Sequence, residues 1–263
     1  MPEAEGKEKI VLITGAGSGL GLGLTEHYLR QGATVYAADI DLQQLNSLKH
    51  ERCHPLMLNV ADAEGVVETV DAIVAEQGRL DLVINSAGIA SAGEFQNITI
   101  QNWDRTIDIN LKGTVYVCSA AYKQMVKQQS GHIVNISSMY GLIASPNLSA
   151  YVSSKHGILG LTYSLYHEAK PHNVKITAVC PGFIDTPFVE KGAYDGISSD
   201  EVAEQIPFTM ISAEKAVRKI VAGIKKEKKK IIFPFYVHVL LAVDRFAPVL
   251  LNWTYQAFLR PRP

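Results

Sequence analysis

Tyr151 and Lys155 stand four residues apart in the segment YVSSK. On a helix this spacing places a phenol and an ammonium group on one face, with about 6 Å between their Cβ atoms. A free phenol has a pKa of about 10, and a neighbouring positive charge lowers that pKa, so such a pair can exchange a proton near neutral pH. The spacing proves nothing by itself, because Tyr166 and Lys170 repeat it further along the chain.

A serine thirteen residues before each tyrosine distinguishes the two pairs. Ser153 and Tyr166 lie in one uninterrupted helical pattern, in which thirteen residues span about 20 Å, so these two side chains cannot share a substrate. Ser138 instead ends a predicted strand, and the turn-rich segment GLIASPNLS allows the next helix to return beside it. Only Ser138 and Tyr151 can therefore converge. The second pair, which ends at Lys170, is predicted to be an ordinary helix face with its C-terminal charge.

Short β-branched runs alternate with long amphipathic stretches along the chain. The runs are nearly all apolar, which is typical of a parallel sheet covered on both faces. We predict strands at Ile10–Thr14, Thr34–Asp39, Pro55–Asn59, Leu82–Asn85, His132–Ser137 and Val174–Cys180. This strand–helix repeat predicts an α/β fold with a doubly wound, Rossmann-like parallel sheet. Ligands of such sheets bind beyond the C-terminal strand ends, where the candidate residues are Gly15, Asp39, Asn59, Asn85, Ser138 and Pro181.

Glycines follow the first predicted strand in the segment TGAGSGLG. They permit a tight turn and allow the N–H groups of the following helix to approach a pyrophosphate. Asp39 ends the second strand, where a carboxylate can accept hydrogen bonds from both ribose hydroxyls and repels a 2′-phosphate. Neither the glycine loop nor Ile40 supplies an Arg or Lys to neutralise such a phosphate, so the sequence predicts NAD rather than NADP. Asp39 could otherwise cap the next helix, although Asp41 could fill that role.

Two further strand ends carry polar residues. Asn59 is suited to bind an adenine edge through its amide, and the segment from Asn85 to Gly88 allows the chain to pass close to a cofactor. Each of these segments is also explained by an ordinary turn.

The composition limits the partners and the compartment. Lys plus Arg number 25 and Asp plus Glu number 26, so the net charge of −1 gives no global field that would attract nucleic acid. Cys53, Cys118 and Cys180 are widely spaced, with no CxxC or Cys/His cluster, which fits a reducing compartment and predicts no metal site. The N-terminal segment MPEAEGKEK shows no signal-peptide pattern, so we expect a cytoplasmic location.

The chain is expected to form one catalytic domain, residues 1–234, followed by an apolar C-terminal extension, residues 235–263. Within the domain, residues 182–212 read as a long lid segment. The lid carries few charges and many apolar side chains, namely Phe183, Ile184, Phe188, Val189, Tyr194, Ile197, Ile206, Phe208 and Met210. A pocket lined in this way favours an apolar alcohol or ketone, unless these side chains merely pack the lid.

The C-terminal extension permits three interpretations. It is too short, and too broken by Pro234 and His238, to span a bilayer. An amphipathic helix carrying Trp253 and Tyr255, beside the lysine run 225–230, could make peripheral contact with an anionic membrane. The extension could instead be buried at a subunit interface or cover the substrate cleft.

Several motifs together point to one family. TGAGSGLG, NSAG, Asn110, Ser138, YVSSK and PGFIDT, in this order and spacing, resemble the short-chain dehydrogenase/reductase family in its compact single-domain form. The resemblance covers roughly residues 8–233. It implies cofactor contacts from residues around the strand ends: Gly15, Ser18, Gly19, Leu20, Gly21, Asp39, Asn59, Val60, Asn85, Ala87, Gly88, Tyr151, Lys155, Pro181, Gly182, Ile184 and Thr186.

The resemblance also assigns four catalytic residues. It implies that Tyr151 is the general acid/base, exchanging a proton with the substrate oxygen while a hydride moves to or from a nicotinamide ring. Lys155 would lower the pKa of Tyr151, together with the positive charge of the cofactor, and would bind the nicotinamide ribose. Ser138 would hold the substrate oxygen. Asn110 would anchor a water molecule that links Lys155 to solvent.

Three residues depart from the family pattern. Asn59 stands where an aspartate is usual, which should weaken adenine recognition without abolishing it. Ser86 replaces the second asparagine of the usual NNAG motif, and its smaller side chain can alter hydrogen bonds in the loop. Tyr140 is bulkier than the small residue usual at that position, and it either shapes the pocket or packs in the core.

The sequence therefore predicts an NAD-dependent alcohol dehydrogenase or ketoreductase that acts on a small apolar alcohol or ketone as a homodimer or homotetramer. Two alternatives stay open. The first is a nucleotide-sensing binding protein of the same fold, against which the intact Ser138, Tyr151 and Lys155 argue. The second is a membrane-associated scaffold that acts through its C-terminal tail.

Overall fold

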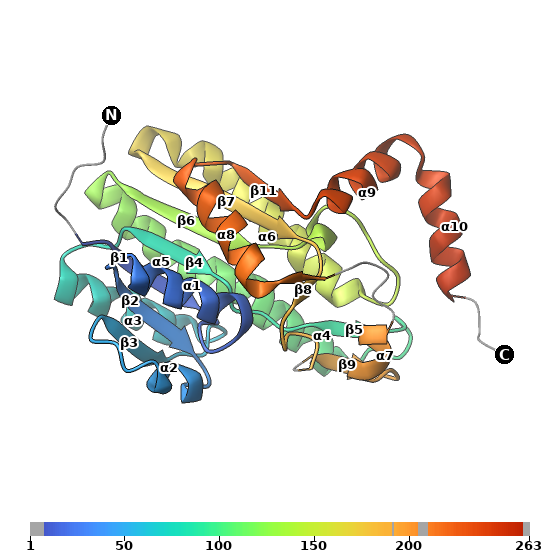
Figure 1. Ribbon diagram of the computed structural model, residues 1–263, viewed down its shortest axis with the longest axis horizontal. Coiled ribbons are helices and arrows are strands. Elements are labelled where there is room, and N and C mark those ends of the chain that lie inside the picture. Colours follow the sequence, from blue (N-terminus) through green and yellow to red (C-terminus); the bar gives the residue numbers. More distant parts are fainter. Residues whose placement is uncertain (1–7, 191, 205–209, 260–263) are drawn as a thin grey trace.

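The computed structural model describes residues 8–190, 192–204 and 210–259. Its main sheet is formed by seven strands: β1 (Ile10–Thr14), β2 (Thr34–Asp39), β3 (Cys53–Met57), β4 (Leu82–Asn85), β6 (Gly131–Ile136), β7 (Val174–Pro181) and β11 (Lys230–Phe233). All neighbouring strands are parallel, in the order β11-β7-β6-β4-β1-β2-β3 (Figure 1). The predicted doubly wound parallel sheet is confirmed.

Three of the six predicted strands have the observed bounds, and the other three are shifted by one or two residues. The seventh strand, β11, lies at the end of the lysine run and in the apolar residues after it, where the sequence analysis predicts no strand. The run KIIF pairs with residues 178–181 of β7 and closes one edge of the sheet. A four-residue strand at a sheet edge carries too short a pattern to be separated from neighbouring apolar sequence.

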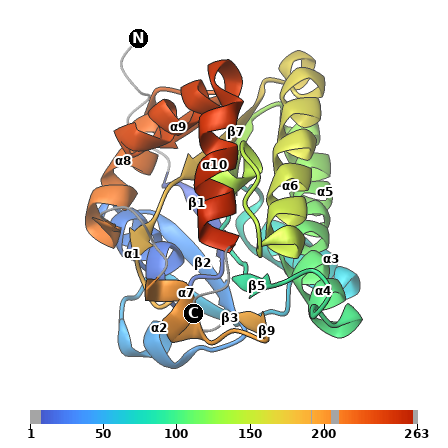
Figure 2. The ribbon, with the colours of Figure 1, turned by 90° about the vertical axis from the view of Figure 1, so that its right-hand side faces the viewer.

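Helices cover both faces of the sheet, which explains the continuous apolar strands. One face is covered by α1 (Gly19–Arg30) and α8 (Ala213–Lys225). The other is covered by α3 (Ala63–Gln77), α5 (Gly113–Gln128) and α6 (Ser149–Glu168). Figure 2 shows these two layers on either side of the strands. All five residues of β1 are buried because this strand lies in the middle of the sandwich.

Capping residues set the ends of several helices. The Asp62 carboxylate accepts hydrogen bonds from the N–H groups of Glu64 and Gly65 at the start of α3, and Gly78 ends that helix with a φ of 71°. The Ser212 hydroxyl accepts a hydrogen bond from the Lys215 N–H at the start of α8. Such caps satisfy N–H groups that have no partner within the helix.

Short elements complete the chain around the strand ends. They are α2 (Gln43–Ser47), β5 (Ser91–Gly93), α4 (Ile100–Ile107), the π-helix η1 (Asp108–Lys112), the 3₁₀-helices η2 (Met139–Gly141) and η3 (Lys170–His172), β8 (Ile184–Asp185), β9 (Ala193–Asp195), α7 (Ser199–Glu204) and β10 (Ile211–Ser212). β5 pairs with β9 and β8 pairs with β10. The predicted lid segment therefore contains three short strands and a helix.

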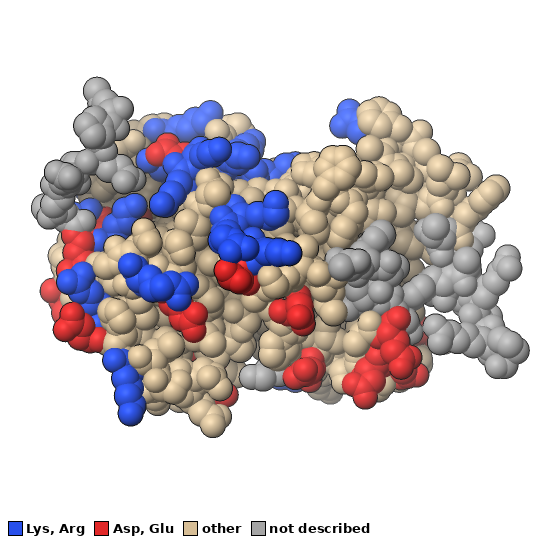
Figure 3. Space-filling view, in the orientation of Figure 1, with Lys and Arg blue, Asp and Glu red and all other residues tan. Residues whose placement is uncertain are grey.

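The C-terminal extension forms two helices, α9 (Phe235–Phe246) and α10 (Pro248–Leu259). They project from the end of β11 on the same side of the molecule as α7 and β9 (Figure 1). Their outer surface is mostly uncharged in Figure 3, and Phe235, Phe246 and Trp253 are exposed. Among the described residues, no helix has both the length and the apolar character needed to cross a bilayer.

His132 of β6 is a buried titratable group that does not lie at the C-terminal strand ends, and 8% of its surface is exposed. Its Nε2 lies 2.8 Å from the hydroxyl of Thr177, which donates its own proton to the carbonyl of Lys228. Nε2 must then carry the proton shared with Thr177. Burial, helped by the positive charge of Lys175, lowers the pKa of His132 from 6.5 to about 4.

Acid should therefore destabilise the protein through His132. The unfolded chain binds a proton at this residue below pH 6.5, whereas the folded protein does so only below about pH 4. The stability contribution is thus complete above pH 6.5 and is lost as the pH falls, by about 2 kcal/mol at pH 5. Urea unfolding at pH 7 and pH 5 measures this loss, and His132→Gln should show a smaller pH dependence than the wild type. Equal pH dependence in the two proteins would contradict this assignment.

Candidate active site

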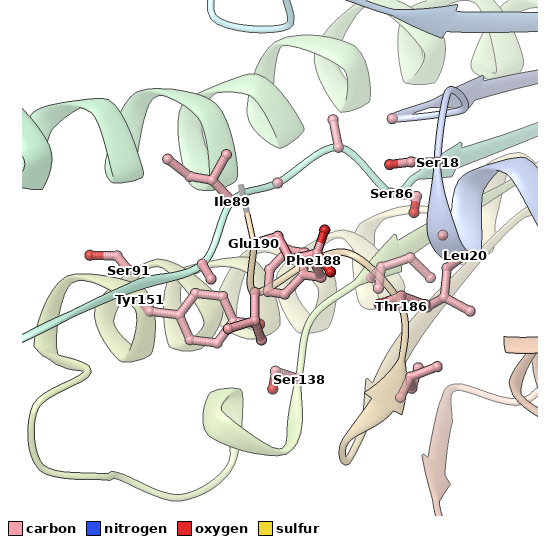
Figure 4. Close-up of a pocket in the computed structure, with 18 of the residues that line it drawn as sticks. Ser18, Leu20, Ser86, Ile89, Ser91, Ser138, Tyr151, Thr186, Phe188 and Glu190 are labelled. Carbon is pink, nitrogen blue, oxygen red and sulfur yellow. The ribbon is translucent and has the colours of Figure 1, made fainter. Parts of the chain in front are cut away.

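A cavity of about 760 Å³ lies beyond the C-terminal ends of the main strands. Predicted site residues from distant parts of the chain line it: Gly15, Ser18, Gly19, Leu20, Gly21, Asp39, Asn59, Val60, Ala87, Gly88, Ser138, Tyr151, Lys155, Pro181, Gly182, Ile184 and Thr186. Figure 4 shows Ser18, Leu20 and Ser86 at one end and Ser138 and Tyr151 at the other. The structure thus brings both predicted groups to one cavity.

The glycine loop between β1 and α1 requires its glycines. Gly15 has a φ of 65°, and a Cβ there would lie 2.6 Å from the Cα of Ala87. A Cβ on Gly21 would lie only 2.0 Å from the carbonyl oxygen of Gly15. Ser18, just before α1, makes no side-chain capping bond to its own helix. The loop therefore presents bare backbone and a helix N-terminus to the cavity, a cradle that fits a pyrophosphate.

Asp39 is oriented by the same loop. One carboxylate oxygen accepts a hydrogen bond from the N–H of Gly17 at 2.8 Å, and the other accepts from the N–H of Asp41 at 3.0 Å. Asp41 in turn accepts from the N–H of Gln43 at the start of α2. Asp41 therefore fills the turn role that was the alternative for Asp39. A carboxylate has about four acceptor sites, so Asp39 keeps capacity for ligand hydroxyls.

Ser138, Tyr151 and Lys155 meet as the spacing predicted. Ser138 is the residue before η2, where its hydroxyl accepts a hydrogen bond from the Tyr140 N–H at 3.2 Å, and it is close enough to the Tyr151 phenol to lower the pKa of that group. Lys155 lies one turn further along α6, with its Nζ 5.5 Å from the centre of the Tyr151 ring. This Nζ donates to the carbonyl of Ile136 at 3.1 Å, at the end of β6. Strand β6 and helix α6 together fix all three groups.

Burial dominates the proton affinities of this group. It raises the pKa of Tyr151 above its ordinary value, and the neighbouring Ser138 side chain opposes that rise. Burial also lowers the pKa of Lys155 to about 8. Burial is thus the largest cause of both shifts, because it disfavours the charged form of each group. That Lys155, together with the charge of a bound cofactor, lowers the pKa of Tyr151 stays a prediction.

Of the second pair, Tyr166 lies at the far end of α6 and Lys170 follows in η3. The Lys170 Nζ is 4.9 Å from the centre of the Tyr166 ring, so the pair does form a side-chain contact. Neither residue lines the cavity. The prediction that this pair is part of an ordinary helix face agrees with its position.

Two predicted site residues lie behind the cavity wall instead of lining it. Asn110, fully buried in η1, accepts a hydrogen bond from the Ile89 N–H at 2.8 Å and donates to the Ile89 carbonyl and to the Ser154 hydroxyl. It holds the segment after β4 against α6. Asn85 turns into the sheet, where its amide donates to Asn135 at 2.8 Å. Its side chain is therefore not placed for the expected cofactor contact.

The three departures from the family pattern have different surroundings. Asn59 is exposed, and its Oδ1 accepts a hydrogen bond from the Ala61 N–H in a local turn. Ser86 lines the cavity near the glycine loop. Tyr140 lines it at the other end, so this residue shapes the pocket.

Aromatic rings form a wall at this second end of the cavity. The Tyr140 ring packs edge-on against Tyr151 and Phe183, with centroids 6.4 and 6.2 Å apart. Phe188 lies 6.0 Å from the Tyr151 ring. Val189, Tyr194 and Met210 of the predicted lid also line the cavity, whereas Ile206 and Phe208 lie outside the described residues.

Some lining residues were missed by the sequence analysis. Ile89 and Ser91 enter from the segment between β4 and β5, and Arg105 enters from α4. The β5–β9 pairing that brings this segment to the cavity joins stretches about one hundred residues apart, so no local pattern indicates it. Within the described part of the chain, no three His, Cys, Asp or Glu side chains are grouped to hold a metal ion.

Comparison with known proteins agrees with this geometry. The family model described as short chain dehydrogenase matches residues 9–195. A 3-oxoacyl-(acyl-carrier-protein) reductase, FabG of Thermotoga maritima, is 39% identical over 189 residues, which cover 70% of this chain and 77% of that protein. A D-threitol dehydrogenase of Mycolicibacterium smegmatis is 33% identical over 205 residues, covering 76% and 78%. The chain therefore belongs to the short-chain dehydrogenase/reductase family.

Solved structures show the same fold. A short-chain dehydrogenase/reductase from Burkholderia phymatum in complex with NAD has a TM-score of 0.84 at 22% identity, covering 93% of this chain and 95% of that one. A short-chain dehydrogenase from Burkholderia cenocepacia in complex with NADP has a TM-score of 0.80 at 22% identity, covering 97% and 99%. This protein is an oxidoreductase of the short-chain type, a family whose members use nicotinamide cofactors.

Proposed function

We propose that this protein is an NAD-dependent oxidoreductase that interconverts an apolar alcohol and the corresponding ketone. The observation that carries the proposal is that Ser138, Tyr151 and Lys155 line the aromatic end of the cavity whose other end is the glycine loop. A nucleotide sensor would need the loop but not this pair of hydroxyls. Within the proposal, residues 1–234 form the catalytic domain and residues 235–263 an extension.

The glycine loop and Asp39 would hold the dinucleotide, and a bound nicotinamide ring supplies the hydride chemistry. Tyr151 exchanges a proton with the substrate oxygen through its phenol. Ser138 donates a hydrogen bond to that oxygen, where negative charge develops. Lys155, whose Nζ donates to the Ile136 carbonyl, places a positive charge beside the Tyr151 ring and would bind the nicotinamide ribose. Asn110 positions the loop at Ile89.

The preference for NAD is supported by Asp39, whose carboxylate stands beside the glycine loop without a nearby cation. Among the lining residues, Arg105 is the one arginine, and it belongs to α4, not to the loops that follow β1 and β2. A 2′-phosphate beside Asp39 would meet a like charge, which costs several kcal/mol.

The apolar substrate class is supported by the aromatic wall. Tyr140, Phe183 and Phe188 surround the Tyr151 phenol with ring surfaces. A ketone is also the reacting group in the name of the Thermotoga maritima relative, a 3-oxoacyl reductase. The D-threitol dehydrogenase relative instead acts on a polyol, so polyols form the competing substrate class in the test.

A substrate screen tests the proposal. Apolar secondary alcohols, apolar ketones and polyols are incubated with NAD(H) or NADP(H), and absorbance of the reduced cofactor is followed. We expect turnover of apolar substrates with NAD(H). Turnover of polyols alone would contradict the substrate class, and a preference for NADP would contradict the role of Asp39.

Of the three interpretations of the C-terminal extension, contacts of the lysine run and of Tyr255 favour one over the others. The lysine run precedes β11 and the apolar helix α9 follows it, so a strand of about 13 Å separates the charges from the apolar face. Lys229 instead lies over the rings of Tyr163 and Tyr166 on α6. Membrane contact is therefore not proposed. The bond from the Tyr255 hydroxyl to Ala144 favours a cover over the cleft.

We also infer that the chain assembles into a homodimer or homotetramer. Large apolar side chains that do not line the cavity are exposed, among them Phe95, between β5 and α4, and Ile100, the first residue of α4, which are 73% and 70% exposed. Burial of such side chains between copies stabilises an oligomer. Sedimentation velocity that shows only a monomer at micromolar concentration would contradict this inference.

A further inference from the structure

The C-terminal helices are tied to the main domain by two tyrosine hydroxyls. Tyr236 of α9 accepts a hydrogen bond from the N–H of Phe183 at 2.7 Å. Tyr255 of α10 donates a hydrogen bond to the carbonyl of Ala144, also at 2.7 Å. The bonded residues are 53 and 111 positions apart in the chain. Both bonds therefore join the extension to loops that the catalytic domain forms.

The first bond fixes the start of the lid. A Cβ on Gly182 would lie 2.3 Å from the Tyr236 hydroxyl, so the glycine allows the phenol to reach the backbone. Val237, the next residue of α9, is fully buried. Gly182 itself donates to the carbonyl of Phe233 in β11. Gly182 is thus held by the sheet, whereas Phe183 is held by α9.

The second bond fixes the loop between η2 and α6. The far part of this loop is attached to β5, because the Asn147 carbonyl accepts a hydrogen bond from the Gly93 N–H at 2.8 Å. The near part is attached to α10 through Tyr255 and Ala144. Leu148, at the end of the loop, lines the cavity.

Both tethered loops contact one ring of the aromatic wall. The Tyr140 ring packs on Phe183, and its hydroxyl is close enough to Ser145, the neighbour of Ala144, for that side chain to lower the pKa of Tyr140. The phenols of Tyr236 and Tyr255 are close enough to add to the effect of burial, which raises the pKa of Tyr140 to about 12. Tyr236 and Tyr255 do not line the cavity themselves. Tyr140 and Phe183, which do line it, connect them to the substrate space.

We propose that Tyr236 and Tyr255 are positioning residues that set the separation of the loops carrying Tyr140 and Phe183, so that the C-terminal extension determines which apolar substrates fit. This inference rests on the proposed function for its kinetic consequences. The hydrogen bonds themselves are tested without a substrate.

Hydrogen exchange of the Phe183 amide is the direct test. Tyr236→Phe removes only the hydroxyl that this N–H donates to, so exchange at Phe183 should become at least about tenfold faster. Tyr166→Phe is the matched control, because Tyr166 lies about 22 Å from Tyr151 along α6, and it should leave the exchange unchanged. Unchanged exchange in folded Tyr236→Phe would overturn the proposal.

Kinetics with 2-butanone and 2-octanone as probes test the effect on specificity. In Tyr236→Phe and Tyr255→Phe, the ratio of KM values for the two ketones should change by about fivefold, the effect expected from one lost hydrogen bond. The kcat and the dissociation constant for NADH should stay within about twofold, because Gly182 and the glycine loop keep their own contacts. A merely structural role would lower kcat for both ketones alike.

The outcomes separate this inference from the proposed function. Faster exchange with an unchanged KM ratio would overturn the role in specificity. If the wild type reduced neither ketone, the proposed function would fail, while the exchange result would still decide whether the hydroxyl holds the lid. Should Tyr236→Phe not fold, Tyr255→Phe carries the kinetic test on a less buried ring, and a KM ratio equal to that of the wild type would then overturn the proposal.

Discussion

Replacing Tyr151 with phenylalanine is expected to lower kcat by about 10²–10⁴-fold, the usual contribution of a positioned general acid or base. The variant keeps the ring that packs against Tyr140 and Phe188 and loses only the hydroxyl group near Ser138. The fold and the glycine loop should therefore be unaffected. Steady-state kinetics together with NADH titration by fluorescence measure both quantities on the same protein.

Tyr166→Phe supplies the matched control for this experiment. Tyr166 has a lysine four residues later and a serine thirteen residues earlier, at the same spacings as Tyr151. It does not line the cavity. We expect it to retain the activity of the wild type. Undiminished turnover in Tyr151→Phe, or an equal loss in both variants, would remove Tyr151 from the chemistry.

Asp39→Asn should shift the cofactor preference towards NADP by at least about 10²-fold in the ratio of kcat/KM values. The amide is nearly the same size, but it carries no charge to repel a 2′-phosphate, and like charges in contact cost several kcal/mol. The ratio follows from this energy, since each 1.4 kcal/mol corresponds to about tenfold. Adding Ile40→Arg should extend the shift by supplying a partner for the phosphate.

Asp41→Asn is the control for a neighbouring carboxylate. Asp41 also lines the cavity, but its carboxylate accepts a hydrogen bond from Gln43. Its replacement should change the preference by less than about threefold, a change that corresponds to under 1 kcal/mol. Kinetics with both cofactors at saturating substrate give the ratios. If Asp39→Asn and Asp41→Asn shifted the preference equally, a general charge effect would replace the specific role of Asp39.

The sequence predicted the elements with strong local patterns. β1, β2 and β4 are buried on both faces, so their continuous apolar runs set their bounds. The convergence of Ser138 and Tyr151 was also predictable, because a parallel strand and the next helix must return to the same edge of the sheet. The same reasoning separated this group from Tyr166 and Lys170 without any structure.

The sequence could not predict contacts that depend on distant chain segments. Asn85 and Asn110 have the residue type of a ligand-binding amide, yet both amides are engaged by groups within the protein. The pKa of Tyr151 depends on burial and on Ser138, Tyr140 and Tyr194, and the spacing along α6 does not indicate these surroundings. The bonds from Tyr236 and Tyr255 to their loops were missed for the same reason, since nothing near either tyrosine indicates its partner.

The two ends of the cavity come from different parts of one polypeptide. The dinucleotide cradle is assembled from β1, β2 and the loops that follow them, whereas the proposed proton-handling hydroxyls belong to the residue before η2 and to α6. Asp39 ends β2 and Tyr151 lies in α6, and side chains that do not touch contribute almost additively to binding and catalysis. Coenzyme selectivity and chemical step are consequently separable traits in this scaffold. An engineer can exchange one while leaving the other intact.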